Sequence, residues 1–135
     1  MKDSHVESQQ GLLHIEQAIS DIEKFIKDEN RKTFCEKDML HDAVMMQFII
    51  IGEIIMHVEN EKLDKYDYPW YKVKSFRNMI AQEYFNIELP AVWQIIEKDL
   101  EQLKGVVQTM LQKEFYRSQY PNVKEKNLYK SISYQ

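Results

Sequence analysis

Apolar residues recur at every third or fourth position through most of the chain, a spacing that places them on one face of an α-helix. Four such runs cover about residues 7–28, 35–63, 69–84 and 90–115, and polar stretches or prolines separate them. Four amphipathic helices with short connections predict an all-α domain, an antiparallel four-helix bundle of residues 1–115. Residues 116–135 would form a C-terminal extension.

The second run is the most apolar part of the chain, and its middle, residues 43–58, is apolar nearly all the way round. A helix of this kind must be covered on most sides, and a single small protomer offers little cover. We therefore expect a homodimer with this helix at the interface. Gly52 costs the helix about 1 kcal/mol relative to alanine, so we expect a neighbouring helix to approach closely there.

Glu53 lies inside this apolar run. A buried carboxylate is costly unless it is paired and hydrogen-bonded, and Arg77 of the third run is the candidate cation. The alternative is that Glu53 lies on one exposed stripe of the helix.

Composition narrows the class of protein. The 135 residues suffice for one domain, and only three glycines and three prolines argue against a β-sandwich or barrel, which needs many turns. The net charge is −4, whereas dedicated nucleic-acid-binding proteins are usually basic, so any RNA contact would rest on a local basic patch.

The single cysteine, Cys35, excludes an intramolecular disulfide and a cysteine-based zinc site. The N-terminus is polar and has no apolar signal segment. The apolar middle of the second run is too short to cross a bilayer comfortably. We expect a cytoplasmic protein without a membrane segment.

The extension, residues 116–135, carries four basic residues against one acidic residue, with tyrosines interleaved between them. Basic residues alternating with aromatic rings can contact single-stranded nucleic acid. The alternatives are a frayed terminus or packing on the protein's own bundle.

The third run holds an ordered set of residues: Trp70, then Arg77-Asn78, three residues, Gln82, one residue and Tyr84-Phe85. It is flanked by three further segments, Asp42-Ala43-Val44, Ile51-Gly52-Glu53 and Val92-Trp93 continuing to Asp99-Leu100. In this order and spacing, about residues 12–112 resemble the HepT-like toxins of the HEPN superfamily.

The resemblance implies a helical dimer in which the Arg-x4-His motifs of two protomers meet in a cleft and cleave RNA without a metal or other cofactor. Arg77 would hold the scissile phosphate, Asn78 matches the polar residue after it, and Glu53 matches a supporting glutamate. Such toxins pair with a small (minimal) nucleotidyltransferase antitoxin, which adds AMP to the tyrosine that Tyr84 matches.

Gln82 stands where the family has histidine. A glutamine amide cannot act as general base, and losing general acid–base catalysis typically costs about 10²–10⁴-fold in rate. One hypothesis is therefore an RNA endonuclease, the toxin of a type VII-like toxin–antitoxin module, that is weakened or inactive. The other is a non-catalytic, nucleotide-binding or partner-docking module that dimerises and binds the nucleotidyltransferase.

The four histidines, His5, His14, His41 and His57, lie outside the motif helix. His57 follows Glu53 by one turn and so could approach the same cleft, although an exposed or core-edge histidine is the simpler interpretation. No pair of histidines has the spacing of a metal-binding motif, so we predict no metal site.

Overall fold

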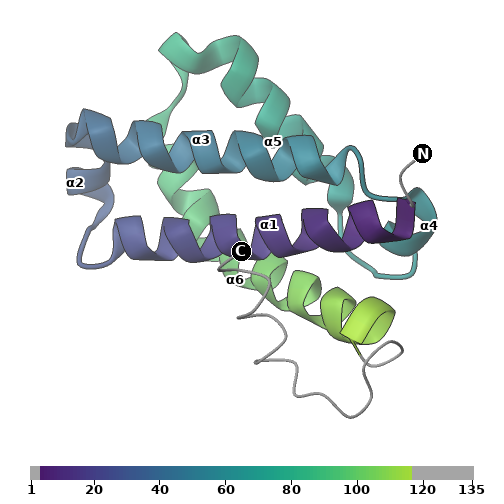
Figure 1. The fold of residues 1–135 in the computed structure, drawn as a ribbon. Coiled ribbons are helices and arrows are strands. Elements are labelled where there is room, and N and C mark those ends of the chain that lie inside the picture. Colours follow the sequence, from purple (N-terminus) through teal and green to yellow (C-terminus); the bar gives the residue numbers. More distant parts are fainter. Residues whose placement is uncertain (1–3, 117–135) are drawn as a thin grey trace.

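The computed structural model describes residues 4–116, and every helix or turn in this range belongs to one helical bundle (Figure 1). The elements are α1 (Ser4–Ile26), α2 (Arg31–Glu36), α3 (Asp38–Ile55), α4 (Asn60–Leu63), α5 (Trp70–Glu83), η1 (Tyr84–Asn86), α6 (Leu89–Leu111) and η2 (Gln112–Tyr116). The expected all-α fold is thus confirmed. Apart from Tyr116, the expected C-terminal extension lies outside the described residues.

The long helices pack through their apolar faces. α1 and α3 run side by side in opposite directions, α5 packs on the other side of α3, and α6 crosses α1 and contacts α2 (Figure 1). The apolar stripe expected on the first helix is buried in full from Leu12 to Ile22. The stripe expected on the last long helix is buried as well, from Val92 to Leu111.

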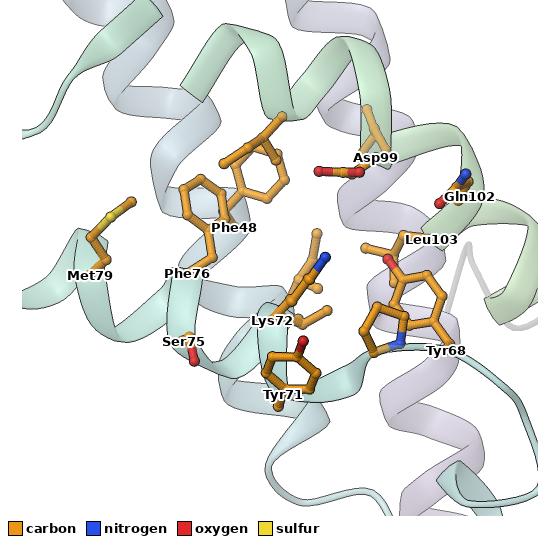
Figure 2. A pocket seen from close by; sticks show the side chains of 15 residues that line it. Phe48, Tyr68, Tyr71, Lys72, Ser75, Phe76, Met79, Asp99, Gln102 and Leu103 are labelled. Carbon is orange, nitrogen blue, oxygen red and sulfur yellow. The ribbon is translucent and has the colours of Figure 1, made fainter. Parts of the chain in front are cut away.

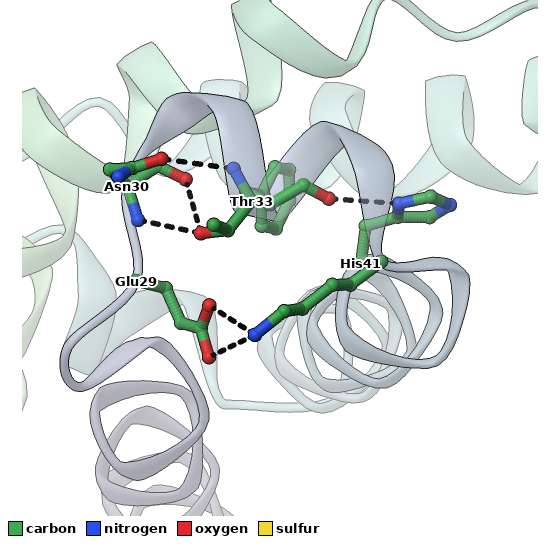
Figure 3. A network of polar contacts seen from close by, with 6 residues as sticks. Glu29, Asn30, Thr33 and His41 are labelled. Atoms are coloured by element: carbon green, nitrogen blue, oxygen red, sulfur yellow. Dashed lines mark hydrogen bonds and ion pairs between the residues drawn. The ribbon is translucent and has the colours of Figure 1, made fainter.

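The second predicted helix, residues 35–63, is wrong at both ends. Asn30 caps a short helix, α2, inside the segment expected to be a break: its Oδ1 accepts from the Thr33 amide, and Thr33 Oγ1 accepts from the Asn30 amide, both at 2.9 Å (Figure 3). Lys37 is extended and separates α2 from α3, with its ammonium 2.9 Å from Glu29. At the other end, α3 stops at Ile55 and residues 56–59 form a turn before α4.

One side of α3 is left uncovered by the other helices of residues 4–116. Met39, Met46 and Ile50 are exposed there, Met46 by 54%. No helix within residues 4–116 is both long and apolar enough to span a membrane.

Candidate active site

α5 is held against α3 by a contact that needs a glycine. A Cβ built at Gly52 would lie 2.2 Å from the Cβ of Arg77 and 3.3 Å from the carbonyl oxygen of Val73. The expected close approach of a neighbouring helix at Gly52 is therefore confirmed. The start of α5 is fixed by Trp70, whose buried indole donates to the Leu63 carbonyl at 3.0 Å.

The close approach brings Arg77 beside Glu53. The guanidinium Nη2 lies 2.9 Å from Glu53 Oε2, and Nη1 donates to Asn78 Oδ1 at 3.0 Å. The predicted ion pair is confirmed, but the predicted burial of Glu53 is wrong, because its side chain is 49% exposed against 28% for Arg77. The pair lies at the surface edge between the two helices, where solvent and a substrate can reach it.

Arg77 has donors to spare. A guanidinium carries five N–H donors, and two of its nitrogens bond within this cluster. Nε is buried and has no hydrogen-bond partner within residues 4–116. The ion pair and the Asn78 contact thus orient the group, and Nη1 and Nη2 each keep a second N–H for an anion such as a phosphate, whereas the buried Nε is closed to a ligand.

Gln82 and Tyr84 do not join this cluster. Gln82 is exposed on α5. The Tyr84 hydroxyl donates to Asp42 of α3, eleven positions from Glu53 and thus about 16 Å along the helix. Arg77 and Tyr84 both contact α3, but their polar ends meet different parts of it.

The sequence did not indicate that Asp42 lies beside Tyr84, or that His41 lies beside Asp42. The hydrogen bond to Asp42, and then desolvation, raises the pKa of Tyr84 above its usual value because the nearby carboxylate favours the protonated phenol. His41 Nδ1 lies 2.9 Å from the Phe34 carbonyl, an acceptor, so this nitrogen carries a proton (Figure 3). Its Nε2 lies 3.6 Å from Asp42. Asp42 belongs to one of the segments that resemble the family, but no feature of the nearby sequence indicates a contact with Tyr84.

His57 lies beside Glu53, the partner of Arg77. It lies in the turn after α3, and its Nε2 is 3.8 Å from Glu53 Oε1. The simpler interpretation, an exposed histidine, is confirmed, since the His57 side chain is 77% exposed, and the structure places it beside Glu53. Within residues 4–116, no group of three or more His, Cys, Asp or Glu side chains is placed to hold a metal ion.

A separate pocket of about 400 Å³ lies between α3, α5 and α6 (Figure 2). The rings of Phe48 and Phe76 meet edge to face inside it, with centroids 5.0 Å apart, and Lys72 and Asp99 lie at its polar edge. Burial, and then Asp99, raises the pKa of Tyr68 at one end. None of Arg77, Gln82 and Tyr84 lines this pocket, so it is distinct from the arginine cluster.

Comparison with known proteins decides the family. The family model described as ribonuclease HepT-like matches residues 15–110, from α1 to the last turn of α6. The chain belongs to the HepT-like ribonuclease family. The matched range includes the Arg77 cluster, Gln82 and Tyr84, and it excludes residues 116–135.

Curated relatives of this HepT-like chain carry ribonuclease names. A protein of Thermococcus cleftensis named "Probable ribonuclease HepT" is 30% identical over 111 residues, covering 78% of this chain and 94% of that protein. A "Putative RNase" of Methanocaldococcus jannaschii is 29% identical over 72% of this chain and 90% of its own length.

Another protein of Methanocaldococcus jannaschii, named "Gamma-glutamylcyclotransferase and putative RNase", is 34% identical over 69% of this chain. The HepT-like chain matches 42% of the length of that relative, less than half. No solved structure matches the chain.

Proposed function

We propose that this HepT-like chain is the toxin of a type VII-like toxin–antitoxin pair and a metal-independent RNA endonuclease of reduced activity. The observation that carries this proposal is Arg77, whose guanidinium is oriented by Glu53 and Asn78 at the accessible edge between α3 and α5. An oriented guanidinium binds a phosphodiester and stabilises the charge that develops on it during cleavage. The ribonuclease names of the relatives agree with this chemistry.

The reduction in activity follows from Gln82. Its amide neither takes up nor releases a proton near neutral pH, and general acid–base catalysis typically contributes about 10²–10⁴-fold. The side chain is exposed on α5, so a histidine in its place would reach solvent without repacking the core.

We infer that two copies form the site. Met46, Ile50 and Glu53 follow one another at helical spacing on α3, so the exposed apolar side of this helix leads directly to the Arg77 pair. A second copy packed on that side would bring the two arginines toward one cleft and would cover apolar surface that a monomer leaves in water.

We propose Tyr84 as the acceptor of AMP from a small nucleotidyltransferase antitoxin. The residue is 38% exposed, and its hydroxyl donates to Asp42 at the surface. Incubating the protein with ATP and a small nucleotidyltransferase of the antitoxin class should add the mass of AMP to a peptide containing Tyr84. Tyr84→Phe should remove the modification, and a modified Tyr84→Phe protein would contradict the assignment.

RNA cleavage by the wild type and by Gln82→His, in EDTA, tests the enzymatic function. We expect slow cleavage by the wild type, a gain of about 10²–10⁴-fold from the histidine, and loss in Arg77→Ala. Equal rates for wild type and Gln82→His would refute the account of Gln82.

The second candidate is a non-catalytic module that dimerises and docks on the nucleotidyltransferase, and the exposed Gln82 favours it. If the wild type and Gln82→His both fold and dimerise but neither cleaves RNA, this candidate replaces the ribonuclease.

A further inference from the structure

Glu53 contacts two nitrogen-bearing side chains at once. Its Oε2 lies 2.9 Å from Arg77 Nη2 and its Oε1 lies 3.8 Å from His57 Nε2. One carboxylate therefore separates the histidine ring from the guanidinium. The histidine and the arginine thus adjoin the same carboxylate.

The other three histidines are placed for different roles. His41 is 8% exposed, and its Nδ1 is committed to the Phe34 carbonyl. His5 packs against the ring of Phe115, with centroids 4.5 Å apart. His14 is exposed on α1, which bears none of the residues of the arginine cluster. The side chain of His57 is 77% exposed and adjoins the Arg77–Glu53 pair.

The environment of His57 suits a proton carrier. Histidine changes its charge near neutral pH, and a carboxylate beside one ring nitrogen favours the tautomer with the proton on that nitrogen. With the proton on Nε2, which lies 3.8 Å from Glu53 Oε1, Nδ1 keeps the lone pair that can accept a proton. A carboxylate beside the imidazole is a recurring feature of general-base histidines.

We propose that His57 supplies the proton transfer that residue 82 cannot, and that the residual RNA cleavage by this chain depends on it. The inference rests on the proposed ribonuclease function. In the step, His57 Nδ1 takes the proton of the RNA 2′-hydroxyl while the 2′-oxygen forms a bond to phosphorus. The bond from phosphorus to the 5′-oxygen breaks, water protonates that oxygen, and Arg77 holds the non-bridging oxygens.

The test measures cleavage of a single-stranded RNA oligonucleotide by the full chain and its variants. His57→Ala should lower the wild-type rate by about 10²-fold, the lower end of what general acid–base catalysis contributes, because the wild type already lacks a histidine at position 82. Added imidazole should restore part of the loss, because the site is open to solvent. His14→Ala, which removes another exposed histidine, should leave the rate unchanged. Circular dichroism of each variant checks that the fold persists.

Rescue by imidazole separates a proton carrier from a structural role, because a misfolded site would not regain activity. A His57→Ala protein that cleaves at the wild-type rate, with Arg77→Ala inactive, would overturn the inference and leave the ribonuclease function standing. A wild type that cleaves nothing while Gln82→His does would overturn it in the same way. If neither cleaves RNA, the proposed function itself fails, and the role of His57 fails with it.

Discussion

The backbone of Gly52 touches the side-chain stem of Arg77: a Cβ on residue 52 would lie 2.2 Å from the Arg77 Cβ and 2.7 Å from its Cγ. Real Cβ atoms essentially never come so close to another atom. α5 can therefore lie at this distance from α3 only because residue 52 has no side chain. The same approach places the guanidinium against Glu53, the next residue of α3.

Gly52→Ala should push α5 away from α3. Overpacking of a close contact typically costs about 1–3 kcal/mol, which outweighs the better helix propensity of alanine, so the free energy of unfolding in urea should fall. Gly105→Ala is the matched control, because a Cβ there meets nothing within 4 Å. That change should raise the free energy of unfolding by about 0.5–1 kcal/mol. A similar gain from both variants would contradict the tight contact.

Asn30→Ala should destabilise the chain through the start of α2. The variant loses the side-chain bond to the Thr33 amide, and removing such a cap costs about 0.5–2 kcal/mol. Urea denaturation followed by circular dichroism measures the change. Asn60→Ala, at the exposed first residue of α4, is the control and should alter stability by much less.

Ile50→Glu should prevent dimerisation. The side chain is exposed in the single chain, so the change leaves the fold intact, but a carboxylate buried without a partner between two copies is costly. Size-exclusion chromatography with light scattering should show twice the chain mass for the wild type and a single chain mass for the variant. Val6→Glu, at an exposed apolar position of α1, should remain dimeric, and a monomeric wild type would rule out the interface.

Asp42→Asn should lower the pKa of Tyr84 toward the ordinary tyrosine value, since the hydrogen bond to the carboxylate is the largest cause of its rise. NMR of ¹³C-labelled tyrosine, with the Tyr84 signal assigned from Tyr84→Phe, follows the titration. Asp64→Asn, at another exposed position, should leave that signal unchanged.

The sign of the linked stability follows from the direction of this shift. Folded Tyr84 holds its proton more tightly than the unfolded chain does, so the contribution is present in full below the ordinary tyrosine pKa, about 10. It is lost as the pH rises through the higher pKa of the folded chain. Wild type and Asp42→Asn should therefore converge in stability at alkaline pH, and a difference that widens there would contradict the contact.

Two features of the candidate site were predictable because their residue types conflict with their surroundings. A glycine and a glutamate within an apolar helix each indicate a contact with another element. The helix that carries Arg77 makes both contacts: it packs closely on Gly52, and Arg77 pairs with Glu53. The exposure of Glu53 was not predictable, because it depends on where the edge of α5 falls. The helix break at Lys37 was not predictable either, because the apolar pattern continues across this residue. The cap at Asn30 starts a separate short helix, α2, which ends there.

The sequence by itself determined the four long helices, their buried faces and the family, because helical periodicity and motif spacing are local properties. The pairing of Glu53 with Arg77 could also be expected from sequence, and His57 lies one helical turn after Glu53. Only the tertiary structure decided that Tyr84 meets Asp42, 42 positions away, and that the Arg77–Glu53 pair lies at the surface. Those contacts depend on the distance and angle between packed helices, which here follow from a glycine that leaves room for an arginine.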